Sequence, residues 1–242
     1  MGTLHLIFVA LAVAINIAVF YYVRDKGEDH LLNLLWVLGL IMLIAEVFKQ
    51  WFCYKYIYGE QISLIYFPWQ LCSIAMYLSF AVKYLKGKSQ DAALVYLCSF
   101  SLLGAIMALA FPGGMLLEGS VFMIHSFIYH ALIISESIIA LEILKKRERP
   151  SFLPSLWLFF ITAAIAESIN VLGKLIINDP SREPEMFYIS PFYPTSQPIL
   201  SDIAGKIGML PEVVLYMCSL ILASYLIFLA EDRAFFSNTE KS

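Results

Sequence analysis

A cysteine and a histidine that could act together occur in two apolar segments of this sequence. Cys72 ends the run Pro68-Trp69-Gln70-Leu71-Cys72, and His130 lies in a later apolar segment. A thiol becomes a nucleophile when a base removes its proton, and a nearby imidazole is the usual base. Such a pair could attack an ester carbonyl to form a thioester, with Gln70 donating a hydrogen bond to the oxyanion. The corresponding reaction is acyl transfer or ester hydrolysis.

Other ionisable and amide side chains also interrupt long apolar segments. An ionisable group inside a membrane helix costs several kcal/mol unless it is paired or solvated, so each is a candidate functional group. On ideal helical spacing, most of these groups fall in one half of the bilayer, which predicts a polar cavity shared by several helices. Glu136 lies deeper and has no obvious partner. The supporting cluster is Glu46, Gln50, Gln70, His125, Glu136, Glu167 and Asn170.

Simpler interpretations stay open for the same residues. Cys72 could be a small apolar residue in a helix interface, and His130 could hydrogen-bond a neighbouring helix. Glu46 and Lys49 are three residues apart, so they could form an ion pair that only stabilises the bundle. His125 and His130 are five residues apart and point in different directions from a helix. We therefore expect no metal site, and no sequence feature predicts a cofactor.

Composition sets the class of protein. The chain has 242 residues, of which 60% are hydrophobic and 14% charged, and its mean hydropathy is +0.77. A soluble domain carries roughly a quarter charged residues, so a soluble protein is excluded. The net charge of −3 and the lack of a basic patch argue against a nucleic-acid partner. The expected fold is all-α, a single polytopic membrane domain over residues 1–242 with membrane lipids as partners.

Seven apolar windows are long enough to cross a bilayer core of roughly 30 Å as helices. Basic residues concentrate after the fifth window, at Lys145, Lys146, Arg147 and Arg149. The positive-inside rule then predicts that the C-terminus is cytoplasmic and that the N-terminus lies outside. The expected location is the plasma membrane. The windows are about 3–23, 31–53, 66–85, 91–111, 120–144, 152–177 and 209–231, with a long outer loop at about 178–208.

Three motifs resemble the YwaF family of bacterial integral membrane proteins. They are Pro68-Trp69-Gln70-Leu71-Cys72, the segment from Gly104-Ala105 to Ala108-Leu109-Ala110-Phe111-Pro112, and His130-Ala131-Leu132-Ile133. That family is similar to animal multi-pass proteins that include a phospholipid acyltransferase with a Cys and a His implicated. The resemblance implies these roles for Cys72 and His130. Gln70 stands where the family often has His.

Two functions follow from these patterns. The first is a lipid acyltransferase or lipid hydrolase that uses Cys72 and His130 in the outer half of the bilayer. The alternative is a small-molecule or proton-coupled transporter or binding module, in which intramembrane Glu46, Glu136 and Glu167 titrate or coordinate a substrate and Cys72 only packs.

Overall fold

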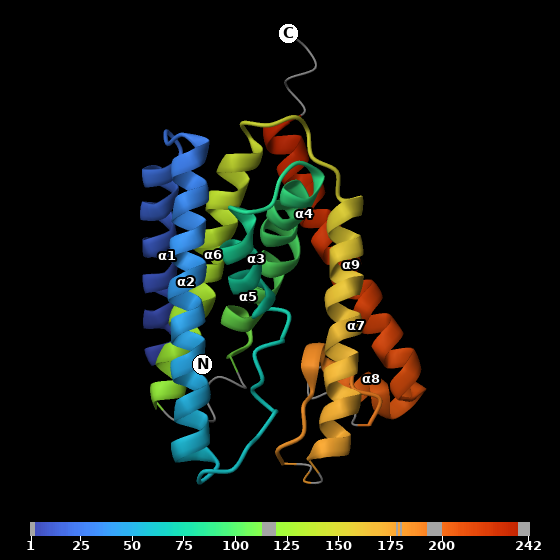
Figure 1. Cartoon of the computed structure of the whole chain (residues 1–242). Coiled ribbons are helices and arrows are strands. Elements are labelled where there is room, and N and C mark those ends of the chain that lie inside the picture. The colour runs from blue at the N-terminus through green and yellow to red at the C-terminus, as the bar shows by residue number, and fades with distance from the viewer. Residues whose placement is uncertain (1–2, 113–119, 178, 180, 193–199, 237–242) are drawn as a thin grey trace.

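The protein is a bundle of helices (Figure 1). The helices differ widely in the share of their residues that is buried. The computed structural model describes residues 3–112, 120–177, 179, 181–192 and 200–236, and these contain no strand. The helices are α1 (Thr3–Val23), α2 (Glu28–Phe52) continued by a π-helical turn (Cys53–Ile57), α3 (Ile74–Val82), α4 (Lys88–Tyr96), a second π-helical turn (Leu97–Ser101), α5 (Leu102–Ala110), α6 (Ser120–Leu144), α7 (Leu153–Ile176), the 3-10 turn Met186–Tyr188, α8 (Leu200–Ile207) and α9 (Met209–Phe235).

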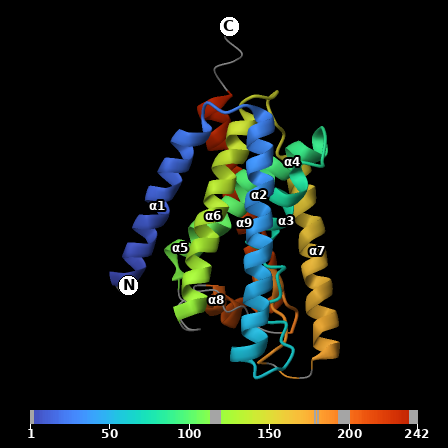
Figure 2. The same cartoon turned by 60° about the vertical axis from the view of Figure 1, so that its left-hand side comes forward.

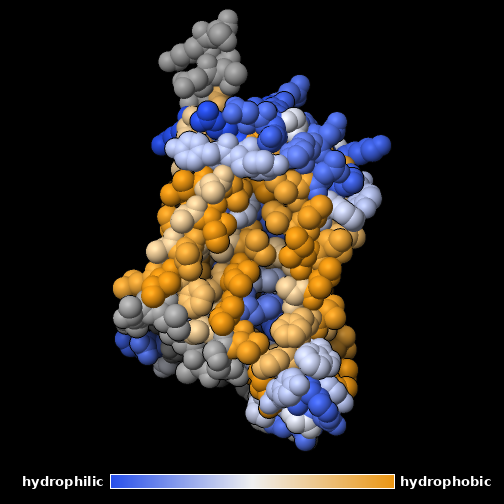
Figure 3. Space-filling model, turned by 90° about the vertical axis from the view of Figure 1, so that its left-hand side faces the viewer, coloured by the Kyte–Doolittle hydropathy of each residue, from blue (hydrophilic) through white to orange (hydrophobic). Residues whose placement is uncertain are grey.

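Six helical stretches of the described chain are long and apolar enough to cross a membrane. They are α1, α2, the continuous helix from α4 to α5, α6, α7 and α9, and they correspond to six of the seven predicted windows. Figure 3 shows the apolar band that they form between two hydrophilic ends. The multi-pass, all-helical prediction is confirmed, whereas a seventh full-length span is not.

The predicted helix at 66–85 is wrong in its first half. Only Ile74–Val82 is an α-helix of this window, and the chain from Tyr58 to Ser73 is mostly irregular. Irregular backbone is tolerated at membrane depth only where protein supplies its hydrogen bonds. Here the Leu64 N–H donates to the Arg182 carbonyl at 2.8 Å, and the Tyr77 hydroxyl donates to the Pro68 carbonyl at 2.9 Å. Pro68 also lacks the N–H that a helix would use.

Helix α6 lies at the centre of the bundle. It contacts α1, α2, α3, α4 and α5, and Figures 1 and 2 show it beside both α1 and α2. Its residues are mostly apolar, and 72% of its most apolar window is buried, including polar side chains such as Glu136 and Ser137. In contrast, α9 packs mainly on α8 and the second π-helical turn, and only 6% of its most apolar window is buried. Most of α9 therefore lies on the outer surface of the bundle.

The second π-helical turn lies in the middle of the span formed by α4 and α5. A π-helical turn leaves backbone carbonyls without regular helical partners. The Ser137 hydroxyl of α6 donates to the Leu97 carbonyl at 2.8 Å, and the Cys98 thiol donates to the Ser137 carbonyl at 3.4 Å. These bonds join the turn to α6 and fix Cys98 as a packing residue.

One end of the bundle, here called the basic end, is tied together by arginines. Arg147 donates to Asp91 at 2.6 Å and to Glu28, which connects the loop after α6 to α2 and α4. Burial opposes the charge of Arg147, but its hydrogen bonds to Glu28 and Asp91 outweigh burial and raise its pKa. Arg149 holds Asp232 of α9 through two hydrogen bonds. Helix α9 ends at the basic end, and α1 begins toward the opposite end (Figure 1).

The predicted loop at 178–208 contains structure of its own. The turn Met186–Tyr188 and helix α8 lie within it, and Met186 and Phe187 are fully buried. Asn178, Pro180 and residues 193–199 of this predicted loop lie outside the described residues. This connection therefore supplies part of the protein interior as well as a surface loop.

Candidate functional site

An ion pair on α2 forms the first polar group inside the apolar band. Lys49 Nζ lies 2.7 Å from Glu46 Oε1, and the two side chains are only 13% and 5% exposed. Gln50 Nε2 donates to the same Glu46 oxygen at 2.7 Å and to the Tyr66 carbonyl at 2.5 Å. The pairing of Glu46 with Lys49 that their spacing allowed is confirmed. Gln50 links this pair to the irregular segment that leads to Cys72.

Two histidines of α6 face this region. His125 Nε2 donates to the Ala45 carbonyl of α2 at 3.2 Å, so His125 joins the two helices. His130 Nδ1 lies 2.7 Å from the Ser126 carbonyl. Because a carbonyl only accepts hydrogen bonds, Nδ1 carries the proton and a neutral His130 keeps a lone pair on Nε2. That nitrogen has no hydrogen-bond partner among the described residues, so it is available as a base.

Cys72 lies close enough to this ion pair to interact with it electrostatically. It is half-buried, immediately before the N-cap of α3. Its thiol interacts electrostatically with Lys49 and Glu46, and His130 also interacts with Lys49. Among the described residues, the structure records no hydrogen bond between the Cys72 sulfur and the His130 imidazole. The two groups share the Lys49 ammonium as a neighbour.

A second polar group holds the segment Glu183–Ser190 inside the bundle. Asn170 of α7 accepts from the Met186 N–H at 2.6 Å and donates to the Met186 carbonyl at 3.2 Å. Gln70 donates to the Glu185 carbonyl at 2.9 Å and accepts from the Phe187 N–H at 2.9 Å. Two carboxamides thus bind three consecutive residues of backbone. We call this arrangement the amide clamp.

The clamped segment has an unusual backbone. Phe187 and Tyr188 have φ angles of 57° and 56°, in the left-handed region that residues with side chains rarely adopt. Each such residue costs on the order of 1 kcal/mol, and surrounding contacts must impose it. The Phe187 ring is fully buried, 6.3 Å from Phe159 of α7, and the amide clamp holds the backbone on both sides. Gln70 therefore has a positioning role that its spacing from Cys72 did not predict.

Close packing of α7 also positions this segment. A Cβ atom at Gly173 would lie 2.4 Å from Pro184 Cγ, so no larger residue fits there without displacement. Lys174 Nζ lies 2.9 Å from a Glu183 oxygen. Asn170, Gly173 and Lys174 thus hold this segment from neighbouring turns of α7. Their types are the sequence signal that could have indicated the clamp.

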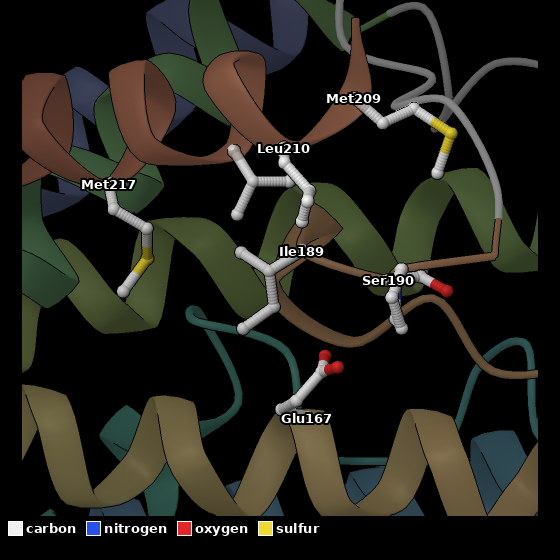
Figure 4. Close-up of a pocket in the computed structure, with 8 residues that line it drawn as sticks. Glu167, Ile189, Ser190, Met209, Leu210 and Met217 are labelled. Atoms are coloured by element: carbon white, nitrogen blue, oxygen red, sulfur yellow. The ribbon is translucent and has the colours of Figure 1, made fainter.

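Glu167 lies at a cleft between α7, the clamped segment and α9 (Figure 4). Its carboxylate is half-buried, accepts a long hydrogen bond of 3.4 Å from Asn170 and points toward Ile189 and Ser190. The cleft has a volume of about 230 Å³, and apolar side chains of α9 form its other wall. The lining residues are Glu167, Ile189, Ser190, Pro191, Met209, Leu210, Val213 and Met217.

Glu136 makes no hydrogen bond to either polar group among the described residues. Its side chain is fully buried in α6, and Ser79 of α3 faces it. Neither the carboxyl nor the Ser79 hydroxyl makes a hydrogen bond of normal geometry within the described residues. The nine predicted site residues are thus divided among the α2–α6 region around Cys72, the amide clamp with Glu167, and Glu136 alone.

Sequence comparison with known families agrees with this membrane fold. The model of the TMEM164 family matches residues 1–230, which is nearly the whole chain. The chain belongs to the TMEM164 family. This match supports a multi-pass membrane protein, and it gives no support to the expected YwaF-like membership or to acyltransferase activity. No curated protein and no solved structure matches the chain.

Metal-binding groups can be assessed directly in this TMEM164-family protein. Among the residues that the structure describes, no three His, Cys, Asp or Glu side chains come together in a way that could hold a metal ion.

Replacing Asn170 by Leu is expected to destabilise the TMEM164-family protein by about 2–4 kcal/mol. The leucine removes both hydrogen bonds to Met186 and leaves a buried N–H and a buried carbonyl unpaired, each costing about 1–3 kcal/mol. The measurement is the melting temperature of the purified protein. Ser168→Ala is the control, because Ser168 is exposed on the same helix and bonds only within it. An unchanged melting temperature for Asn170→Leu would contradict the amide clamp.

Proposed function

We propose that this protein is a lipid acyltransferase or lipid hydrolase that uses Cys72 as nucleophile and His130 as base. The observation that carries the proposal is the position of the Cys72 thiol. It lies inside the apolar band, in a region that also contains the Glu46–Lys49 pair and an imidazole with an unbonded Nε2. Glu46 and Lys49 compensate each other, so the region can hold polar atoms of a lipid without an uncompensated charge.

The reaction that fits these groups has two steps. His130 Nε2 takes the thiol proton while the Cys72 sulfur attacks the ester carbonyl of a membrane lipid, and the carbonyl oxygen becomes an oxyanion. The ester C–O bond then breaks, the leaving alcohol takes the proton from His130, and an acyl thioester remains on Cys72. In the second step an acceptor alcohol or water, deprotonated by His130, attacks the thioester carbonyl. The C–S bond then breaks, and the leaving Cys72 sulfur takes the proton from His130. The product is a new ester or a free fatty acid.

The expected location follows from the charge distribution. With the basic end in the cytoplasm, the N-terminus lies outside and the site lies in the outer half of the plasma membrane. Lipid ester carbonyls lie just below the headgroups, so a thiol at that depth can reach them. The resemblance to YwaF-like proteins supports the same assignment of Cys72 and His130.

Acyl release from phospholipids tests the proposal. Purified protein is incubated with phosphatidylglycerol and phosphatidylethanolamine labelled in their acyl chains, and labelled fatty acid and labelled acyl acceptors are measured. We expect Cys72→Ala and His130→Ala to lose the activity. The control is Cys218→Ala, because Cys218 is an exposed thiol on α9. Full activity in both site variants would exclude the thiol–imidazole mechanism.

A transporter or binding module is the second candidate, and Glu136 favours it. A fully buried carboxyl without a hydrogen-bond partner among the described residues is a feature of intramembrane proton or substrate sites. The irregular segments at 58–73 and 183–190 also resemble the interrupted helices of transporters. Here the measurement is pH-driven uptake into vesicles containing the protein. Uptake that Glu136→Gln abolishes and Cys72→Ala leaves unchanged would favour this candidate over the enzyme.

A further inference from the structure

The hydroxyl of Tyr129 is a buried polar group without a partner. The Tyr129 side chain is 5% exposed, and its hydroxyl makes no hydrogen bond with any described residue. A buried hydroxyl normally has a partner, because leaving it unpaired costs the free energy of its lost hydration. A tyrosine kept in such a place therefore indicates a ligand that hydrogen-bonds to it.

Two histidines fix the direction of the Tyr129 ring. The His125 ring stacks on it at 5.6 Å between centroids, with an angle of 22° between the planes. The His130 ring meets it at 6.1 Å and 72°, an edge-to-face contact. His125 is itself tied to α2 through the Ala45 carbonyl, so this stack of three side chains has a defined orientation. The hydroxyl is thus preorganised, which is the property required of a donor to a developing charge.

The Tyr129 hydroxyl belongs to the same region as the proposed nucleophile. It interacts electrostatically with the Cys72 thiol and with Glu46. The sequence-based candidate for the oxyanion donor, Gln70, uses both ends of its carboxamide in the amide clamp. Tyr96 and Tyr216 also interact with Cys72, but the Tyr96 hydroxyl has Thr162 as a partner and Tyr216 is only half-buried. Tyr129 presents a buried hydroxyl donor without a partner among the described residues.

We propose that the Tyr129 hydroxyl hydrogen-bonds the carbonyl oxygen of the lipid ester and stabilises the oxyanion that forms when Cys72 attacks. This inference rests on the proposed function. The sulfur forms a bond to the carbonyl carbon, and the π electrons of the carbonyl move to its oxygen. Tyr129 donates a hydrogen bond to that oxygen and keeps its own proton, while the thiol proton goes to His130 Nε2. When the tetrahedral intermediate collapses, the carbonyl re-forms and the alcohol leaves with the proton from His130.

The test measures acylation of Cys72 by p-nitrophenyl palmitate in detergent micelles. Release of p-nitrophenolate gives the rate, and the mass of the peptide containing Cys72 identifies the acylated residue. Tyr129→Phe keeps the ring stack and removes only the hydroxyl. We expect the acylation rate to fall about 10²–10³-fold, as for the loss of one oxyanion donor. The melting temperature should not fall, because the removed hydroxyl has no partner in the resting protein.

Tyr96→Phe is the matched control. Tyr96 is also fully buried and also interacts electrostatically with Cys72, but its hydroxyl already has a partner, Thr162 Oγ1 at 3.4 Å. We expect this variant to melt at a lower temperature and to acylate Cys72 at the unmodified rate. Equal rate losses in the two variants would overturn the special role of Tyr129, as would a Tyr129→Phe rate equal to that of the unmodified protein.

A different set of results would reject the proposed function itself. If the unmodified protein acylates no faster than Cys72→Ala, the thiol is not a nucleophile, and both the proposed function and the role of Tyr129 are rejected. If Cys72→Ala abolishes acylation and Tyr129→Phe does not reduce it, the nucleophile is supported and only the oxyanion donor is rejected. A lower melting temperature of Tyr129→Phe would show that its hydroxyl has a structural partner and would also reject the inference.

Discussion

With His130 replaced by Ala, acyl release from labelled phospholipid is expected to fall by a factor of about 10²–10⁴, the usual contribution of a general base. The variant keeps the Cys72 thiol but lacks the Nε2 lone pair that would take its proton. Imidazole added to the buffer is therefore expected to restore part of the rate, because it fits the space left by the lost ring. Cys72→Ala lacks the sulfur atom itself, so imidazole should restore nothing there.

His5→Ala is the control for this experiment. It removes a buried imidazole of α1 whose Nε2 donates to the Leu109 carbonyl of α5, a structural bond between these two helices. We expect His5→Ala to lower the melting temperature and to show no increase in rate with imidazole. If imidazole accelerates the two histidine variants equally, or if His130→Ala keeps the full rate, His130 is not the base.

Replacing Gly39 by Ala is expected to destabilise the protein by about 1–3 kcal/mol, in the range typical of overpacking. A Cβ atom at Gly39 of α2 would lie 2.5 Å from the Phe80 backbone nitrogen and 3.0 Å from the Met76 carbonyl oxygen of α3. Because both neighbours are backbone atoms, no side chain can rotate away, and α2 and α3 must separate. The measurement is the fraction of monodisperse protein that survives heating.

Gly104→Ala is the matched control for Gly39→Ala. At Gly104 of α5, the added Cβ would meet only the Leu71 side chain, at 3.8 Å or more. Alanine is favoured over glycine inside a helix by roughly 0.5–1 kcal/mol, so this variant should be slightly more stable than the unmodified protein. Equal heat resistance of the two variants would contradict the close contact between α2 and α3.

Much of the fold could be predicted because the length of each apolar segment alone determines where most of the membrane-spanning helices lie. The predicted windows 3–23 and 120–144 agree with α1 and α6 at both ends, and 152–177 differs from α7 by one residue at each end. The window at 66–85 failed for a physical reason. In its first half the backbone forms local turns, and the Tyr66 and Pro68 carbonyls accept from the side chains of Gln50 and Tyr77. Apolar composition cannot distinguish that arrangement from a helix.

The candidate site was predictable only where partners are close in sequence. Glu46 and Lys49 are one helical turn apart, and their ion pair follows from that spacing. The amide clamp joins Gln70 and Asn170 to the backbone of residues 185–187. Every residue has the same backbone groups, so the residue types at 185–187 do not indicate these hydrogen bonds. Tyr129 was not singled out, because a tyrosine in an apolar helix is ordinary until its hydroxyl is found without a partner.

The sparse packing of α9 has a consequence for any measurement on this protein. The helix forms one wall of the cleft beside Glu167, and Arg149 attaches it at the far, basic end through Asp232. Since so little of α9 is covered by protein, the molecules that surround it help to set its tilt and with it the width of the cleft. The cleft beside Glu167 therefore need not have the same width in detergent micelles as in a bilayer. The choice of detergent or nanodisc affects what is measured.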